Sequence, residues 1–185
     1  MTAEFRERLT ARVVLLDPDG RVLLMKGRLP GRPDGPAFWY TVGGGVEAGE
    51  TLAEAAAREV AEETGLVDVV LGETVWRDEV ILRDLDHEKR LFRQFYVVAR
   101  TAGGDITDAG WLPHERVLTD DMRWWTLDEL RVAEDTFYPI GLADLMGDLL
   151  GGHVAPEPLL ICTIDGPVSP LPRPPTAIEG HPFDP

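Results

Sequence analysis

Three glutamates, Glu59, Glu62 and Glu63, stand at helical spacing near the end of a helix-favouring stretch. Side chains three and four positions apart share one face of an α-helix, and like charges at that spacing repel by about 0.2–0.5 kcal/mol per pair. Gly65 follows as the expected C-terminal cap, and acids are disfavoured at this negative end of the helix dipole. The three carboxylates therefore either form a solvated face or surround a cation.

Three consecutive glycines, Gly43 to Gly45, lie shortly before the same helix. Glycine lets the backbone turn sharply and approach a ligand closely, and free N–H groups at a helix start favour anions. Carboxylates are hard oxygen ligands suited to Mg²⁺ or Mn²⁺, and magnesium commonly takes phosphate oxygens as further ligands. The glycines and the acids together predict phosphate chemistry at a divalent metal, which neutralises phosphoryl charge and activates water.

The helix that carries the acids is expected over residues 51–64. Thr51 and Glu54 form a capping-box pattern at its start. Its buried face is predicted from apolar residues at helical spacing, namely Leu52, Ala55, Ala56 and Val60.

Alternating and β-branched runs predict strands on both sides of this helix. Before it, a hairpin is expected from residues 11–17 and 21–27, and a short strand at 37–41 runs into the glycines. After it we expect strands at 69–71, 74–82 and 91–101, a long polar loop to residue 121, a strand and helical turn at 122–130, and a helix at 138–152 with Pro139 at its start. This mixture indicates an α/β fold.

The segment from Gly44 to Leu66, GGVEAGETLAEAAAREVAEETGL, fits the pattern G-x5-E-x7-R-E-V-x-E-E-x-G-L. It resembles the Nudix box, the signature of the Nudix hydrolases, at every defined position. The resemblance covers this segment directly, and the expected strand order resembles the family over residues 10–150.

The resemblance implies a Nudix fold, a mixed β-sheet sandwiched between α-helices, over residues 1–150. It also implies a hydrolase that cleaves the diphosphate linkage of a nucleoside diphosphate joined to another group, by water attack on phosphorus. Residues 151–185 contain nine prolines and are expected to form a partly ordered extension, with one possible strand at LLICTID.

The resemblance assigns metal binding to four residues of the glycine loop and the helix. It implies that Glu62 and Glu63 bind Mg²⁺ or Mn²⁺ with Glu59 beside them. The carbonyl of Gly43 is implied as a further ligand.

The same resemblance assigns supporting roles within the box. Gly44 begins it and Gly65 ends the helix, Glu50 braces the loop against the helix, and Arg58 orients a box glutamate. A simple helical ion pair of Arg58 with Glu54 or Glu62 is compatible with that role.

The general base varies within the family, so the resemblance leaves it open here. It is either a box glutamate or an acid of the later loop, which offers Glu115, Asp120 and Asp121. Glu115 is the preferred loop candidate, and the predicted catalytic set is Glu59, Glu62, Glu63 and Glu115.

Two further side chains are candidates for substrate binding. Trp39 precedes the glycines and can stack on a base, although strand alternation also allows it a place in the core. Arg28 follows a strand and can meet phosphate, with an exposed loop arginine as the alternative.

Residues 80–84 carry neither the proline of ADP-ribose-type relatives nor the tyrosine of diadenosine-polyphosphate types. A nucleoside triphosphate, a nucleotide sugar and a dinucleotide stay open as substrates.

Charge and composition restrict the partners. The chain has 18 basic and 33 acidic residues, a net charge of −15, which argues against nucleic-acid polymers and anionic membranes. A single cysteine, Cys162, suits a reducing compartment, the N-terminus lacks the apolar core of a signal peptide, and no apolar run is long enough to span a membrane. We therefore expect a cytoplasmic protein that binds a small nucleotide or other diphosphate substrate.

Two alternatives remain beside the enzyme. Some Nudix-like domains are non-catalytic nucleotide sensors, although those often have a degraded box. A helix whose acids only pack against a partner would show no metal dependence. The proline-rich extension is compatible with a homodimer in which it closes over the neighbour's site.

Overall fold

The computed structural model describes residues 5–29, 34–83, 88–111, 113, 115–163 and 166–167. Within these residues the chain forms the elements β1 (Arg6–Leu16), β2 (Val22–Gly27), β3 (Phe38–Thr41), α1 (Leu52–Thr64), β4 (Val69–Arg83), β5 (Lys89–Thr101), α2 (Glu115–Leu118), β6 (Thr119–Trp125), α3 (Leu127–Val132), β7 (Phe137–Tyr138), α4 (Leu142–Leu150), β8 (Leu159–Thr163) and β9 (Gly166–Pro167). Within the described residues, no helix is long and apolar enough to cross a membrane.

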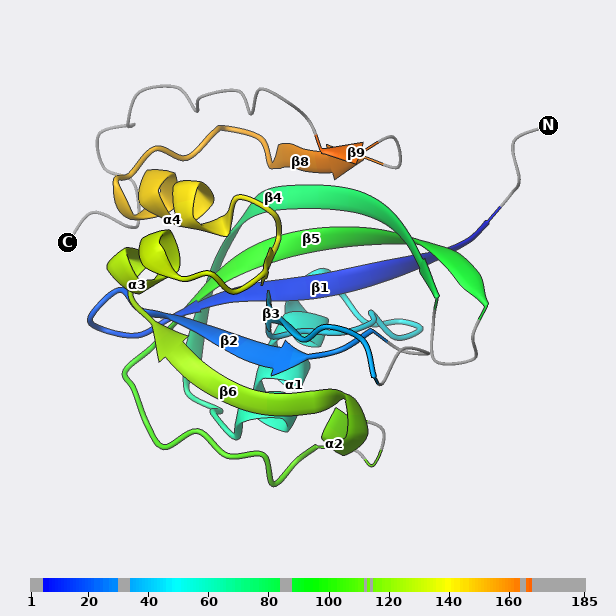
Figure 1. The fold of residues 1–185 in the computed structure, drawn as a ribbon, viewed down its shortest axis with the longest axis horizontal. Helices are drawn as coiled ribbons and strands as arrows, with labels where there is room; N and C mark the ends of the chain where they lie inside the picture. Colours follow the sequence, from blue (N-terminus) through cyan, green and yellow to red (C-terminus); the bar gives the residue numbers. More distant parts are fainter. Residues whose placement is uncertain are drawn as a thin grey trace.

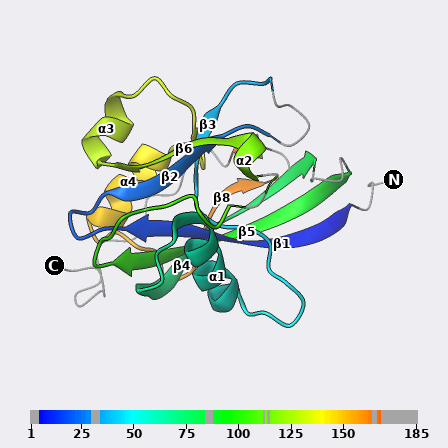
Figure 2. The same cartoon turned by 90° about the horizontal axis from the view of Figure 1, so that it is seen from below.

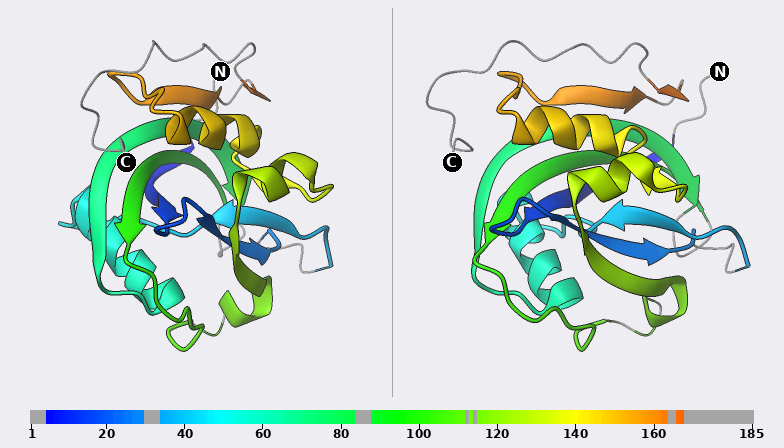
Figure 3. Two further views of the ribbon diagram at one scale, coloured as in Figure 1. Left: turned by 90° about the vertical axis from the view of Figure 1, so that its left-hand side faces the viewer. Right: turned by 60° about the vertical axis from the view of Figure 1, so that its left-hand side comes forward.

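The described strands belong to one mixed sheet in the order β7-β3-β2-β1-β5-β4-β8-β9, and β6 also pairs with β2 (Figure 1). β1 pairs with β5 in parallel over its whole length, from Arg6 opposite Arg90 to Leu16 opposite Arg100. β4 and β5 form a long antiparallel pair and appear as strongly curved arcs in Figure 3. The predicted α/β class with a mixed sheet is confirmed.

Helices cover both faces of this sheet (Figure 2). Alternate residues of β1 point to opposite sides: Ala11, Val13 and Leu15 pack with the apolar face of α1, and Val14 and Leu16 pack with the core beside α3 and α4. The sandwich expected from the resemblance is therefore present, and α1 is fixed to the sheet by its buried side.

Several elements differ from the sequence prediction. The loop expected up to residue 121 contains α2 and the first residues of β6. β1 begins at Arg6 rather than residue 11, because pairing with β5 extends a segment whose own side chains are largely exposed. The strands expected at 69–71 and 74–82 are one strand, β4, with a register shift between Leu71 and Thr74. α4 begins at Leu142 rather than near Pro139, and Tyr138 belongs to the short strand β7.

The strand predicted within LLICTID is present as β8, which pairs in parallel with β4. β8 therefore belongs to the same sheet as β1 to β5, although it lies beyond residue 150. The division of the chain into residues 1–150 and 151–185 stays a prediction, and residues 168–185 lie outside the described part.

Candidate functional site

Local signals place the box helix where the sequence predicts it. Thr51 caps α1, its side chain accepts from the Glu54 backbone N–H, and the Glu54 carboxylate accepts from the Thr51 N–H, so the capping box is formed. Gly65 ends the helix in the left-handed region at φ 76°. The capped helix gives the glutamates a fixed direction relative to the glycine loop.

The three glutamates of α1 differ in exposure. Glu59 and Glu63 are buried, with 8% and 6% of their surfaces exposed, because they lie toward the loop and the sheet. The Glu62 side chain is 53% exposed. The carboxylates thus sit at the border between the protein interior and solvent, where a ligand can reach them.

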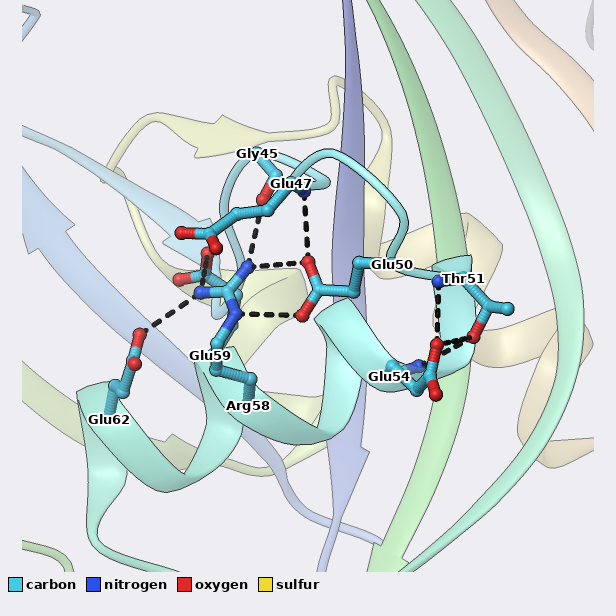
Figure 4. A network of polar contacts seen from close by, with 8 residues as sticks. All are labelled: Gly45, Glu47, Glu50, Thr51, Glu54, Arg58, Glu59 and Glu62. Atoms are coloured by element: carbon cyan, nitrogen blue, oxygen red, sulfur yellow. Dashed lines mark hydrogen bonds and ion pairs between the residues drawn. The ribbon is translucent and has the colours of Figure 1, made fainter.

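Arg58 gathers the acids of the box (Figure 4). Its Nη1 donates to Glu59 at 2.8 Å and to Glu62 at 3.1 Å, and its Nε and Nη2 donate to the two carboxylate oxygens of Glu50 at 2.8 and 3.0 Å. Nη2 also donates to the Gly45 carbonyl at 2.9 Å. Arg58 therefore orients two box glutamates at once and ties the loop to the helix through Glu50, as the resemblance implies for both residues.

Glu63 holds the glycine loop from the helix side. Its Oε2 accepts from the Gly43 N–H at 2.7 Å. Gly43 has φ +129°, and a Cβ there would lie 2.1 Å from the Ala11 carbonyl oxygen. At Gly44 a Cβ would lie 2.4 Å from Oε1 of Glu59. Gly43 needs glycine because its φ is positive and the backbone of β1 is so close, whereas a side chain at position 44 would displace the Glu59 carboxylate.

Replacing Gly43 with alanine should therefore destabilise the protein where the glycine loop passes β1. We expect Gly43→Ala to lower the free energy of unfolding by about 3 kcal/mol, because backbone of β1 must move to relieve the overlap. Gly49→Ala is the matched control, since Gly49 also has positive φ (+87°) but open space at the Cβ position, and it should cost only about 1 kcal/mol. Chemical denaturation measures both, and equal losses would show that the overlap is unimportant.

A polar chain that the sequence reasoning missed reaches the loop from the sheet. Arg12 of β1 donates through Nη1 to the Gly43 carbonyl at 2.8 Å and through Nε to Gln94 at 2.7 Å. Gln94 donates to Asp78 at 2.9 Å, and Asp78 also accepts from the Tyr96 hydroxyl at 2.8 Å. The available signal was the polar residues inside strands of otherwise alternating pattern, but only the register of β1, β5 and β4 brings them together.

Burial and hydrogen bonding shift several pKa values in and behind the site. Burial raises the pKa of Glu59, while the hydrogen bond and charge of Arg58 oppose the rise. The hydrogen bond from Arg58 is the main cause that lowers the pKa of Glu50. Burial also raises the pKa of Asp78 against its hydrogen bonds from Tyr96 and Gln94. Arg58 therefore favours the charged forms of Glu50 and Glu59, although burial has the larger effect on the pKa of Glu59.

The raised pKa of Asp78 predicts a pH-dependent stability. The folded chain holds this proton more tightly than the unfolded chain, so its contribution is full below the ordinary pKa of 3.8 and falls as pH rises through the raised value. We expect the unfolding free energy of the wild type, minus that of Asp78→Asn, to decrease as pH rises from 3.8. Denaturant titrations at several pH values test this, with the exposed Asp148→Asn as control. Parallel pH curves for wild type and Asp78→Asn would contradict it.

The two predicted substrate residues lie in different surroundings. Trp39 is only 3% exposed, packs edge-on against Trp125 with ring centroids 4.9 Å apart, and donates from Nε1 to Asp135. The prediction that its ring stacks on a substrate base is therefore corrected: Trp39 is a core residue. Arg28 donates to the Gly35 carbonyl and pairs with Asp120 at the surface, so its guanidinium is already engaged, and a phosphate role for it stays a prediction.

The candidate bases of the later loop are only partly described. Asp120 is engaged by Arg28, and Asp121 accepts from the backbone N–H of Met122 at 2.8 Å. Glu115 begins α2, but its side chain lies outside the described part of the structure. Glu115 stays a predicted base.

The residues present suit a divalent cation by their chemistry. Carboxylates of Glu59, Glu62 and Glu63 and the Gly43 carbonyl are hard oxygen donors: Glu59 and Glu62 share Arg58, and Glu63 accepts from the Gly43 N–H. Glu59 and Glu62 accept from the same nitrogen of Arg58, so a positive charge already sits between them. Over the described ranges no three acidic, histidine or cysteine side chains stand together as a ready-made metal group; the oxygens face Arg58 and the Gly43 N–H instead. Metal binding would require these acids to turn from those partners.

Comparison with known proteins places the chain in a family. A family model for the NUDIX domain matches residues 6–143. The "RNA pyrophosphohydrolase" of Caulobacter vibrioides is 49% identical over 63 residues, which cover 34% of this chain and 35% of that protein. The "Oxidized purine nucleoside triphosphate hydrolase" of Danio rerio is 31% identical over 139 residues, with 66% of this chain and 80% of that protein covered. The "Octanoyltransferase" of Myxococcus xanthus is 51% identical over 49 residues, and the chain spans only 13% of that protein's length and 35% of the Caulobacter protein's length.

The fold leads to the same family. The NUDIX domain of Shewanella oneidensis NrtR, solved in complex with ADP ribose, superposes with a TM-score of 0.57 at 19% identity and covers 80% of this chain and 91% of that chain. The glycine loop, the box helix and the curled mixed sheet define a domain of the Nudix class. The chain belongs to the NUDIX family, whose members act on pyrophosphates and on nucleoside diphosphates linked to a further group.

Proposed function

We propose that the chain is a metal-dependent pyrophosphohydrolase that cleaves a phosphoanhydride bond of a small nucleotide by water attack on phosphorus. The observation that carries the proposal is the cluster in which Arg58 joins Glu50, Glu59 and Glu62 to the glycine loop. An intact box with this geometry supports catalysis over mere packing, because a helix that only packed would have no need of a buried carboxylate such as Glu59.

Mg²⁺ or Mn²⁺ would be held by Glu59, Glu62, Glu63 and the Gly43 carbonyl, and when bound it supplies charge neutralisation and an activated water. The chain's own residues position the reaction. Glu63 keeps the loop in place through the Gly43 N–H, and Gly44 leaves room next to Glu59 for a close approach. Glu62, the exposed box acid, can accept the proton of the attacking water, with Glu115 as the alternative base.

A nucleotide-type substrate is supported by the names of the relatives. The Danio rerio relative is named for an oxidised purine nucleoside triphosphate, and an Escherichia coli relative, 34% identical over 118 residues, is named a dihydroneopterin triphosphate diphosphatase. Both names describe compounds that end in a triphosphate. The net charge of −15 favours such a small substrate over a nucleic-acid polymer.

A substrate panel tests the proposal. The protein is incubated with nucleoside triphosphates, oxidised purine nucleoside triphosphates, dihydroneopterin triphosphate, ADP-ribose and a nucleotide sugar, each with Mg²⁺, with Mn²⁺ and with a chelator. We expect release of phosphate or pyrophosphate from at least one compound, only with metal. Mg²⁺ should also raise the melting temperature, because it binds the folded site alone.

The same panel separates the enzyme from a non-catalytic sensor. Saturable binding of a nucleotide with no turnover under any metal condition would favour the sensor. Turnover that is unaffected by the chelator would overturn the metal site.

A further inference from the structure

Arg12 stands beside the candidate catalytic loop, although the Nudix box does not include it. Its Nη1 lies 2.8 Å from the carbonyl oxygen of Gly43, the loop position proposed as a metal ligand. It is also close enough that its charge opposes the rise in the pKa of Glu59, which burial causes. The guanidinium is therefore at the reaction site rather than elsewhere on β1.

A chain of hydrogen bonds among buried strand residues fixes this guanidinium on the side away from the loop. Arg12 Nε donates to Gln94, whose amide nitrogen donates to Asp78, and Asp78 also accepts from Tyr96. The exposures of Asp78, Gln94 and Tyr96 are 5%, 7% and 3%. A fully hydrogen-bonded buried network is rigid, so the direction of the Arg12 side chain is set before any ligand arrives.

Arg12 differs from Arg58 in how its charge is used. Arg58 contacts three carboxylates, whereas the two hydrogen bonds of Arg12 within the described residues go to neutral oxygens of Gln94 and Gly43. Its Nη2 has no hydrogen bond to any described residue. A fixed guanidinium with free donors and no contacting carboxylate is suited to an anion.

We propose that Arg12 is a substrate-contacting residue that donates from Nη2 to an oxygen of the phosphate held at the Gly43 loop. This role rests on the proposed function. Arginine offers planar donors that match phosphate, and a positive charge fixed in advance stabilises the charge on the phosphoryl oxygens during transfer.

The test measures binding of inorganic pyrophosphate to the full chain in the presence of Mn²⁺, beside binding of Mn²⁺ alone, by calorimetry. We expect Arg12→Ala to weaken pyrophosphate binding by about 10- to 100-fold, the range for a hydrogen bond to a charged group. Mn²⁺ binding should not weaken, because Arg12 contributes no metal ligand. Arg12→Lys keeps the charge and should fall between the wild type and Arg12→Ala.

Arg131→Ala is the matched control, since Arg131 is an exposed arginine of α3 whose contact is with Asp128, and it should change neither affinity. If Arg12→Ala left the affinity for pyrophosphate unchanged, this proposal would be overturned, but the proposed hydrolase function would not. If both Arg12→Lys and Arg12→Ala lost Mn²⁺ affinity and pyrophosphate affinity to the same extent, Arg12 would only support the Gly43 loop. That result would also overturn the proposal. A wild type that neither turns over the panel nor binds pyrophosphate with Mn²⁺ would overturn the proposed function as well.

Discussion

Replacing Glu62 with glutamine is expected to lower kcat by about a thousandfold or more while the chain stays folded. The substitution keeps the shape of the side chain and removes its charge. A metal site supplies several kcal/mol of transition-state stabilisation, and each 1.36 kcal/mol corresponds to a tenfold change in rate. Because the Glu62 side chain is 53% exposed and bonds only to Arg58 among the described residues, the loss should appear in activity rather than in stability.

Steady-state kinetics on the best compound of the panel, with thermal unfolding in parallel, measure this effect. Glu157→Gln makes the same chemical change at an exposed position outside the box and should leave kcat unchanged. Near wild-type turnover in Glu62→Gln would show that Glu62 is neither an essential metal ligand nor the base, with Glu115 as the next residue to replace.

The second large effect is expected from Arg58. Arg58→Met keeps much of the side-chain length but removes every hydrogen bond to the box, which leaves the buried carboxylate of Glu59 without its counter-charge. Removing one partner of a buried pair is strongly destabilising, and because Arg58 is partly exposed we expect a loss of about 3 kcal/mol. Glu59 and Glu62, which the change releases, should then bind Mg²⁺ with a larger stabilisation than in the wild type.

Chemical denaturation with and without Mg²⁺ tests both parts. The control is Arg131→Met, since Arg131 is 55% exposed and lies 3.5 Å from Asp128, and a surface pair of this kind contributes little. If Arg58→Met were no less stable than Arg131→Met, Arg58 would not be the residue that balances the box charge. If Mg²⁺ stabilised Arg58→Met less than the wild type, the acids would not form the cation site.

The sequence predicts α1 well because its signals are local. A capping box, an apolar stripe and a terminal glycine all act within one helix, and each is present in the structure. The direction of Arg58 follows from the same short stretch. The fold class also follows, since the order of strands and helices leaves few arrangements that bury the apolar faces.

What the sequence does not predict depends on contacts between distant segments. Arg12 meets Gln94 across 82 positions, and nothing near either residue shows that their strands are neighbours. Trp39 is equally ambiguous from its own surroundings, because only the positions of Trp125 and Asp135 decide that it is buried. The start of β1 is set by its partner β5 rather than by its own charged residues.

The strand β8 has a consequence for how the molecule behaves in solution. β5 pairs with one edge of the long strand β4, and β8 pairs with part of the other edge. The pairing of that second edge therefore depends on a segment that follows residue 150. A sheet edge with unpaired N–H and C=O groups is a template for pairing with other chains. β8 therefore covers this edge of β4, and a fragment cut at residue 150 would expose the edge and also lose the core residues Val154 and Ile161, although its box would be intact.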